Sequence, residues 1–386
     1  MVFRRQTGFL SPLMKSPSSA TKSLRIDQID RNFASSAGKT NLVWLDAFDS
    51  RLSLRGLGWP KENYRTRTFW RFPKRAEKSV RPDVKVLSQM PSGVFLSFFT
   101  DSPDISIRME VGNTDQMDHM PASGMAGAEL YLRVAGVWHP AGVAKPSLTE
   151  TLFQRPLLED AARTMRECRV YLPLYKGVEA VALGFARGAK VRPSPVPAGQ
   201  KPLLFYGTSI TQGGCANTAG SDYVSTLGRM LGAEVLNLGF SGNGRGEPEV
   251  AKLIREVDAE VYVLDFLTNA DVGKLEQTLP NFIRLLREKR RKASIAIVSC
   301  PAFDKTLWNP TRRAADDRKR DIAMRSYLDL KAAGDNNLFF IDGNGILPAG
   351  LSGAYVDGVH PTSHGFAIMA ERMLPQLQAI RSREGP

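Results

Sequence analysis

The sequence predicts two folded domains, an antiparallel β-sandwich over residues 41–189 and an α/β domain with a five-stranded parallel sheet over residues 202–386. In the first range, apolar and polar residues alternate in short runs separated by turn residues, which is typical of antiparallel strands with one buried face. In the second range, continuous apolar runs alternate with helical stretches, which indicates parallel strands covered on both faces. A length of 386 residues agrees with two or three domains.

The composition is that of a globular chain and excludes several classes of protein. Hydrophobic residues make up 42% and charged residues 24%, and glycine and proline together are 57 of 386, too few for low-complexity disorder. No apolar run approaches the roughly 18 residues of a membrane-spanning helix, so we expect no membrane span. The three cysteines, Cys168, Cys215 and Cys300, are scattered, which excludes a disulfide scaffold and a CxxC zinc site.

Positive charge is concentrated at the start of the chain. The formal net charge is +13, and residues 1–80 hold sixteen Lys and Arg against six Asp and Glu. Such a stretch can attract nucleic acid, anionic lipid or acidic polysaccharide, but we interpret it as a solvated basic surface and expect no specific nucleic-acid partner. Residues 1–40 are predicted to be a basic, disordered tail. They lack the continuous apolar core of a secretory signal, which favours a cytoplasmic location.

The sandwich strands follow from the period-two runs. The clearest run places Ile105, Ile107, Met109 and Val111 on one face of a strand. Strands are predicted at residues 94–99, 105–111, 129–134, 170–174 and 178–185. Residues 190–201 then contain three prolines and no periodicity, which predicts a stiff linker between the two domains.

The α/β domain follows from five apolar runs and the helical stretches between them. Parallel strands are predicted at residues 202–206, 234–238, 260–266, 294–299 and 338–341. Helices are predicted at residues 222–231, 247–257, 274–289, 317–333 and 365–377. Because ligands of such folds lie beyond the carboxyl ends of the strands, the polar clusters at those ends supply the candidate functional residues.

The first parallel strand runs directly into residues 206–214, which read YGTSITQGG. A serine at such a strand-to-helix corner holds its hydroxyl at the edge of the sheet, which suits a nucleophile. Ser209 is therefore the candidate nucleophile. The alternative is that Ser209 or Thr208 only caps the following helix.

A serine nucleophile needs a base, and the chain has four histidines: His119, His139, His360 and His364. We favour His360, because Asp357 lies three residues before it across a glycine and could fold back to orient the imidazole. His364 is expected to be a histidine at the start of the last helix. The rival interpretation is a metal site of Asp357, His360 and His364. Pro361 disturbs the single helical face that such a site requires, so we expect no metal.

Two further strand ends offer hydrogen-bond donors for an oxyanion. The N–H group of Gly242 is free of any side chain that would intrude, and the amide of Asn269 is a second donor, besides the N–H group of Ser209 itself. The alternative is that both residues serve only in turns. A second alternative is a dinucleotide site built on the glycines at 242, 244 and 246 and on Asp265, but their spacing is G-x-G-x-G and not G-x-G-x-x-G.

These clusters, in this order at successive strand ends, resemble the SGNH (GDSL-like) hydrolase superfamily, whose pattern is Ser, Gly, Asn and a late Asp-x-x-His. The matching residues are Ser209, Gly242, Asn269, Asp357 and His360. The resemblance extends upstream, because residues 127–131 (GAELY) are similar to the GxDLY motif of a sandwich domain that precedes one SGNH subgroup. Residues 171–175 (YLPLY) and 206–214 are also typical of that subgroup. The match covers about residues 41–377.

The resemblance implies an α/β fold with a flavodoxin-like α/β/α hydrolase domain preceded by a jelly-roll-like β-sandwich. It also implies a serine esterase that hydrolyses short-chain esters, often acetyl esters of carbohydrates, without a metal or an organic cofactor. Three positions depart from the pattern. Glu129 stands where GxDLY has Asp, Thr208 stands where the superfamily has its name-giving Asp, and Ala270 replaces the last residue of Gly-x-Asn-Asp.

Three residues are candidates for substrate binding. Trp308 could form an aromatic platform for a sugar, with packing as its alternative role. His119 and Glu129 could line the site if the two domains meet there, although we favour an interior position for both. Two functions other than hydrolysis stay open: an O-acyltransferase with the same triad, and a non-catalytic protein that binds a glycan or polyanion. The sequence makes no prediction of oligomeric state.

Overall fold

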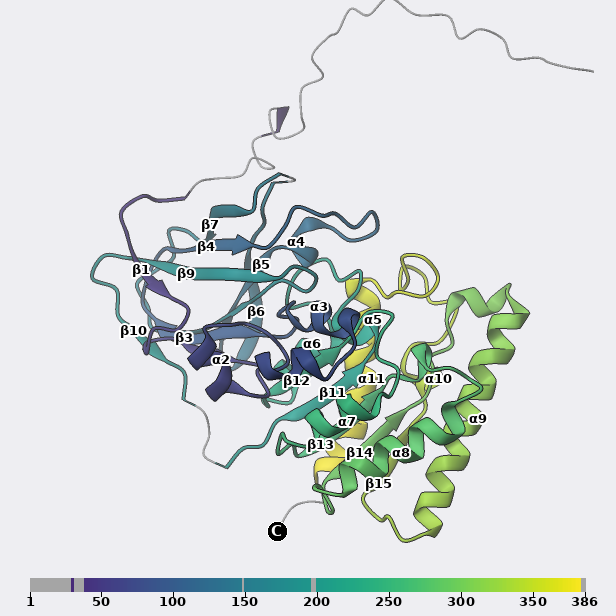
Figure 1. Cartoon of the computed structure of the whole chain (residues 1–386). Coiled ribbons are helices and arrows are strands. Elements are labelled where there is room, and N and C mark those ends of the chain that lie inside the picture. The colour runs from purple at the N-terminus through teal and green to yellow at the C-terminus, as the bar shows by residue number, and fades with distance from the viewer. Residues whose placement is uncertain (1–28, 31–37, 148, 196–198, 383–386) are drawn as a thin grey trace, which may run out of the picture. The chain divides into compact units, whose positions relative to one another are not determined.

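Three β-sheets make up the core of the computed structural model, which describes residues 29–30, 38–147, 149–195 and 199–382 (Figure 1). Two sheets are antiparallel and belong to the N-terminal half, and the third is parallel and belongs to the C-terminal half. The predicted order of an antiparallel sandwich followed by an α/β/α domain is therefore confirmed. The predicted N-terminal tail lies almost wholly outside the described residues.

The sandwich joins a four-stranded and a six-stranded sheet. The first has the order β1 (Leu42–Asp46), β9 (Val178–Ala186), β4 (Ile105–Val111) and β7 (Leu152–Leu158). The second has the order β10 (Val191–Pro193), β3 (Phe95–Thr100), β8 (Arg166–Tyr171), β5 (Ala128–Val134) and β6 (Val137–Ala144), and β2 (Ser53–Arg55) also pairs with β3. Alternate residues of each sheet meet in one apolar core, which includes Ile107 from the first sheet and Phe98 from the second.

Several elements of the N-terminal half have no clear period in the sequence. Strand β6 is mostly exposed and therefore lacks a buried face that would show as alternation. Strand β10 lies inside the range expected to be a linker. The sequence does not predict this strand because three residues are too few to show a period. The segment between β2 and β3 is helical, with α2 (Pro60–Thr66), the 3-10 helix η2 (Lys74–Lys78) and α3 (Pro82–Ser88).

The parallel sheet has the order β12 (Val235–Gly239), β11 (Leu203–Gly207), β13 (Val261–Asp265), β14 (Ser294–Val298) and β15 (Leu338–Ile341). Successive residues of β11 enter different cores. Leu204 and Tyr206 face one core together with α7 (Pro248–Ile254), α8 (Leu275–Arg287) and α9 (Pro310–Ala332). Leu203 and Phe205 face the other together with α6 (Tyr223–Met230) and α11 (Ser363–Ser382). Both faces of the sheet are therefore covered, as the continuous apolar runs predicted.

Helix α9 begins seven residues before its predicted start. Residues 310–321 carry no large apolar side chain, and the first one in the helix is Ile322, so hydrophobic periodicity gives no signal for the start of the helix. The true start has a local signal, because Asn309 caps the helix by accepting a hydrogen bond from the N–H group of Arg312, and Pro310 follows in the first turn.

The helical segment between β2 and β3 packs against both domains, because Phe69 belongs to the sandwich core whereas other apolar residues of the segment face the parallel sheet. Trp59, Phe72 and Val84 belong to the same apolar core as Leu236 and Leu238 of β12. Arg71, 1% exposed, lies in this segment as well. On the opposite side, the guanidinium carbon of Arg229 in α6 lies 4.0 Å from the ring centroid of Tyr131 in β5. The sandwich thus contacts the α/β domain through more than one element.

No helix among the residues that the structure describes is long and apolar enough to cross a bilayer.

Candidate active site

Ser209 is the first residue of the short helix α5 (Ser209–Gln212), directly after strand β11. The helix is capped by Thr208, whose hydroxyl accepts a hydrogen bond from the N–H group of Ile210 at 3.3 Å. In return, Thr211 Oγ1 accepts from the N–H group of Thr208 at 3.1 Å, which completes a capping box. Capping is therefore the task of Thr208, and the Ser209 hydroxyl is left for another partner.

That partner is His360, which lies in the segment between β15 and α11. Ser209 Oγ and His360 Nε2 are 3.0 Å apart. The second ring nitrogen, Nδ1, lies 2.7 Å from Asp357 Oδ2. Because a carboxylate only accepts hydrogen bonds, Nδ1 carries the proton and Nε2 is free to accept from the serine hydroxyl.

Asp357 is held as an anion by its own loop. Its Oδ1 accepts the N–H groups of His360 at 2.7 Å and of Val359 at 3.0 Å. Partial burial opposes the charge, but these donors and the imidazole outweigh it and lower the pKa of Asp357 to about 2. The carboxylate is therefore ionised at neutral pH and able to orient His360.

A buried polar cluster of Thr211, Tyr223 and Asp265 connects α5 to the end of β13. Asp265, at the end of β13, accepts the hydroxyl of Thr211 at 3.0 Å and that of Tyr223 at 2.7 Å. Burial raises the pKa of Asp265 to about 6, although these two donors partly offset the effect. Because its carboxylate is 7% exposed and already paired, Asp265 is not available to a ribose. The dinucleotide interpretation loses its acidic residue.

Gly242 and Asn269 offer donors at the ends of β12 and β13, the two strands that flank β11. Gly242 lies in the turn after β12 with φ +65°, and a Cβ placed there would meet no atom within 4 Å, so its backbone borders open space. Asn269 ends the 3-10 helix η3 (Leu267–Asn269) after β13, and its buried Nδ2 atom has no hydrogen-bond partner among the residues that the structure describes. A buried donor without a partner is rare in folded proteins, and a ligand oxygen would satisfy it.

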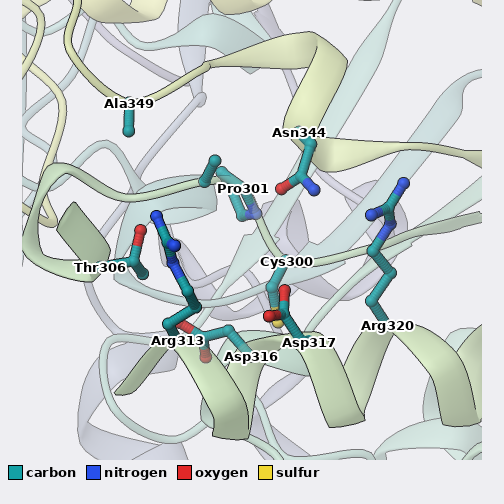
Figure 2. A pocket seen from close by; sticks show the side chains of 10 residues that line it. Cys300, Pro301, Thr306, Arg313, Asp316, Asp317, Arg320, Asn344 and Ala349 are labelled. Atoms are coloured by element: carbon teal, nitrogen blue, oxygen red, sulfur yellow. The ribbon is translucent and has the colours of Figure 1, made fainter. Parts of the chain in front are cut away.

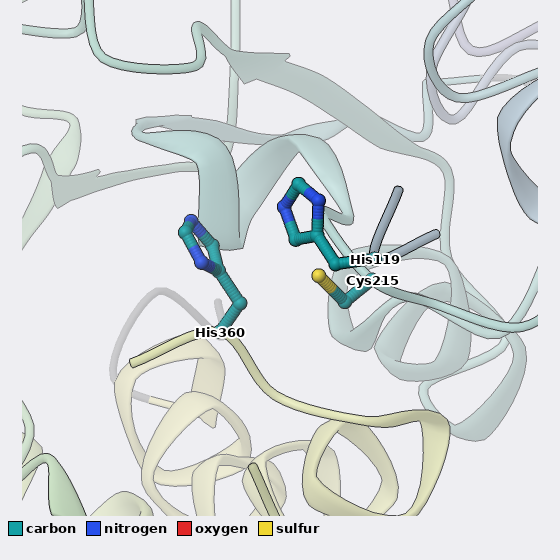
Figure 3. Close-up of side chains that lie close together, drawn as sticks. All are labelled: His119, Cys215 and His360. Carbon is teal, nitrogen blue, oxygen red and sulfur yellow. The ribbon is translucent and has the colours of Figure 1, made fainter. Parts of the chain in front are cut away.

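Two of the three candidate substrate-binding residues lie beside this site. His119 is exposed, and its ring centroid is 5.8 Å from that of His360 (Figure 3). Trp308 is 64% exposed and follows the 3-10 helix η4 (Asp304–Leu307). Its segment lies against the loop that carries Asp357 and His360 (the histidine loop), because the N–H group of Lys305 donates to the carbonyl of Gly358 at 3.0 Å. The interior position favoured for His119 is therefore wrong.

Glu129 has a different environment. It is 3% exposed, and its carboxylate accepts the N–H group of Gly220 at 2.8 Å. Burial raises its pKa, with the donors around it acting in the opposite direction. Glu129 therefore links strand β5 to the loop before α6 and does not face a ligand.

His364 is the second residue of α11 and is exposed, as expected for a histidine at a helix start. It does not join Asp357 and His360 in a metal-ligating group. Within the described part of the chain, His119, Cys215 and His360 form a group whose possible ligand atoms lie within 4.8 Å of one another.

Two residues near the nucleophile were not singled out for a role from the sequence. Cys215 is 1% exposed and lies beside His360. The Tyr175 hydroxyl donates to the carbonyl of Ser209 at 3.3 Å. Tyr175 ends the YLPLY motif, and Cys215 directly follows residues 206–214, so nearness to these two motifs is the signal that the sequence offers for both residues.

A separate pocket of about 270 Å³ lies between α9 and the segment after β14 (Figure 2). It is lined by Cys300, Pro301, Thr306 and Asn344, among others, and the side chains of Arg313 and Arg320 extend from α9 on either side of it. Neither Ser209 nor His360 lines this pocket.

Two family models match the chain. Residues 200–378 match the GDSL-like Lipase/Acylhydrolase family, and residues 42–191 match GxDLY, the N-terminus of Esterase_SGNH_hydro-type proteins. No curated protein matches the sequence.

Solved structures with the same architecture include both hydrolases and a transferase. A protein from Bacteroides ovatus described as a GDSL-like lipase is 28% identical with a TM-score of 0.82, over 89% of this chain and 98% of its own. A salicylyl-acyltransferase from a tetracycline biosynthetic pathway is 18% identical with a TM-score of 0.73, over 89% and 98%. An acetyl xylan esterase from the rumen bacterium Butyrivibrio proteoclasticus is 12% identical with a TM-score of 0.55, over 90% and 100%.

Proposed function

We infer that this chain, which belongs through residues 200–378 to the GDSL-like lipase/acylhydrolase family, is a serine esterase that hydrolyses short-chain esters, acetyl esters of carbohydrates above all. The observation that carries the proposal is the hydrogen-bonded series of Ser209, His360 and Asp357, with distances of 3.0 Å and 2.7 Å. This is the arrangement that activates a serine hydroxyl in acyl transfer.

In the first step, Ser209 Oγ attacks the ester carbonyl while His360 Nε2 takes the hydroxyl proton. The imidazolium that forms is stabilised by the ionised carboxylate of Asp357. As the tetrahedral intermediate collapses, the same proton passes from His360 to the oxygen of the leaving alcohol, and the acyl group stays on Ser209.

The developing oxyanion is received by the N–H groups of Ser209 and Gly242 and by Nδ2 of Asn269. Asn269 is the best supported of these donors, because its Nδ2 has no other partner. A donor that is already in place and unpaired needs no reorganisation when the charge develops.

In the second step, water attacks the acyl-enzyme. His360 takes a proton from the water and returns it to Ser209 Oγ, which releases the carboxylic acid. Neither step needs a metal or an organic cofactor.

Two observations support a carbohydrate ester. The exposed ring of Trp308 borders the histidine loop and offers a flat apolar surface of the kind on which a sugar face can lie. In addition, the Butyrivibrio proteoclasticus protein, which has a similar fold, is an acetyl xylan esterase.

An O-acyltransferase with the same triad is the second candidate. The salicylyl-acyltransferase superposes with a higher TM-score, 0.73, than the acetyl xylan esterase, 0.55. In a transferase, an acceptor hydroxyl takes the place of water in the second step.

The test is a panel of p-nitrophenyl esters from acetate to decanoate, together with acetylated xylan, with and without an added acceptor sugar. We expect the highest kcat/KM with acetate, release of acetate from xylan, and loss of both in Ser209→Ala. More acyl sugar than free acid in the presence of acceptor would favour the transferase. Salt-sensitive binding of a polyanion without turnover of any ester would contradict both enzymatic hypotheses and indicate a binding protein.

A further inference from the structure

His119, Cys215 and His360 come from three separate segments and lie close together (Figure 3). Ser209 is near them, because its Oγ lies 3.0 Å from His360 Nε2. His119 belongs to the loop between β4 and α4 (Ala122–Met125), and Cys215 to the turn after α5. One ligand atom from each of the three residues lies within 4.8 Å of the other two. Figure 3 shows the sulfur of Cys215 directed toward the two imidazole rings.

These donors are the ones that zinc prefers. Imidazole nitrogens and a cysteine sulfur bind Zn²⁺ at about 2.0–2.3 Å, which places the ligand atoms of a tetrahedral site about 3.3–3.6 Å apart. The three side chains therefore need to approach by about 1 Å. His119 can make that movement because it is exposed, whereas Cys215 is buried and His360 is fixed by Asp357.

We propose that His119, Cys215 and His360 form a site for Zn²⁺ and that the bound ion arrests the acyl-transfer reaction. The metal bonds to Nε2 of His360, because Nδ1 is already bonded to Asp357. A carboxylate behind a zinc-bound histidine is the usual outer partner of such a ligand.

Zinc binding and catalysis exclude each other at one atom. The lone pair of Nε2 either accepts the hydrogen bond from Ser209 or bonds to the metal, so a metal-bound His360 cannot take the proton of the nucleophile. Cys215 binds as a thiolate, and its proton passes to solvent. The arrest of turnover rests on the proposed function, whereas the binding of the metal does not.

The experiment measures binding and turnover separately on the full chain. Cobalt(II) replaces zinc as a spectroscopic probe, because a cobalt–thiolate bond gives a charge-transfer band in the near ultraviolet, and zinc is then titrated against the cobalt-loaded protein. Turnover of p-nitrophenyl acetate is followed over the same zinc range, each variant being compared with its own metal-free rate.

Two ligand variants and two matched controls complete the design. Cys215→Ser removes the sulfur, with Cys300→Ser as the control at another buried free cysteine. His119→Asn removes the mobile ligand, with His364→Asn as the control at another exposed histidine. His119→Asn is at the surface and keeps the test open even if Cys215→Ser does not fold.

We expect one zinc per chain, inhibition that a chelator reverses, and a weakening of zinc binding of at least about tenfold in each ligand variant but in neither control. The charge-transfer band should be absent from Cys215→Ser. A band that persists in Cys215→Ser, or ligand variants that zinc inhibits as strongly as the wild type, would overturn the proposal, as would full turnover with the site filled. If no ester is turned over at all, the proposed function is wrong. The metal site is then still tested by the zinc stoichiometry of the wild type and by the loss of zinc affinity in the two ligand variants.

Discussion

Asp357 reaches His360 twice: one carboxylate oxygen lies 2.7 Å from Nδ1 of the ring, and the other accepts the backbone N–H group of the same residue at 2.7 Å. The loop therefore orients both the backbone and the side chain of the histidine through a single acid. Ser209, 151 positions earlier in the chain, meets the opposite ring nitrogen.

Asp357→Asn tests this orientation. The amide can donate to Nδ1, which would favour the tautomer with its proton on Nε2, so His360 could no longer accept the serine proton. We expect kcat for p-nitrophenyl acetate to fall by about 10²–10⁴ with little change in KM. His364→Asn serves as the control and should keep wild-type kinetics. A fall of less than about threefold in Asp357→Asn would show that the carboxylate does not orient the base.

Asn269→Ala separates catalysis from stability. Because Nδ2 of Asn269 makes no hydrogen bond, its removal should change the free energy of unfolding by less than about 1 kcal/mol. The kcat should still fall by about 10²–10³, the usual effect of losing one oxyanion donor. Asn337→Ala, whose side chain donates to Lys292 O away from the site, should leave kcat unchanged. Equal losses in the two variants would argue against an oxyanion role.

Trp308→Ala tests the aromatic platform. We expect KM for acetylated xylan to rise about tenfold while kcat/KM for p-nitrophenyl acetate stays the same, because only the carbohydrate reaches the ring. Because the side chain is 64% exposed, the free energy of unfolding should change by about 0.5 kcal/mol or less. Its neighbour Leu307 is 54% exposed, and Leu307→Ala is the matched control. A parallel loss on both substrates would point to a packing role.

Arg71→Met tests the anchoring of the turn that carries Gly242. Arg71 donates to the carbonyls of Asn237 at 3.1 Å and of Gly239, and also to the carbonyls of Met90 and Leu87, each at 2.7 Å. Without these donors the buried carbonyls stay unpaired, so we expect the free energy of unfolding to fall by about 3–5 kcal/mol in chemical denaturation.

The exposed Arg51 gives the control for that loss. It pairs with Asp49 at the surface, and Arg51→Met should cost less than about 1 kcal/mol. If Arg71→Met were no less stable than Arg51→Met, the anchoring role would be wrong.

Asp265 gives a pH dependence of stability with a defined sign. Its pKa in the folded protein is about 6, above the ordinary value of 3.8, so the folded state holds a proton that the unfolded state releases earlier. The stabilisation that this proton adds to the free energy of unfolding is therefore fully present below pH 4. It is lost between about pH 4 and 6, by up to about 3 kcal/mol. Asp265→Asn should remove this part of the profile when urea unfolding is measured from pH 4 to 7. An unchanged difference between pH 4 and pH 7 would show that Asp265 is not the group responsible.

The sequence located most of the buried strands because their pattern is local. Strands β4 and β15 have the predicted bounds, and the five parallel strands lie within one or two residues of theirs. The polar clusters were found for a similar reason, since Ser209 follows its strand and Asp357 precedes His360 by three residues. Exposed or very short elements such as β6 and β10 have no such pattern, so their pairing depends on neighbours far along the chain.

The amino-acid sequence by itself predicted a sandwich followed by an α/β domain with a parallel sheet, and it put forward Ser209, His360 and Asp357 as candidate residues. Each of these predictions follows from hydrophobic period or from residues within a few positions of one another. Only the tertiary structure decided that His119 and Cys215 lie beside His360 and that Glu129 is buried. The same is true of the hydrogen bond from Arg71 to the carbonyl of Asn237 in β12. These relationships arise where the sandwich packs against the α/β domain. Contacts between segments 90 to 240 positions apart are set by the shapes of both surfaces, and no local spacing encodes them.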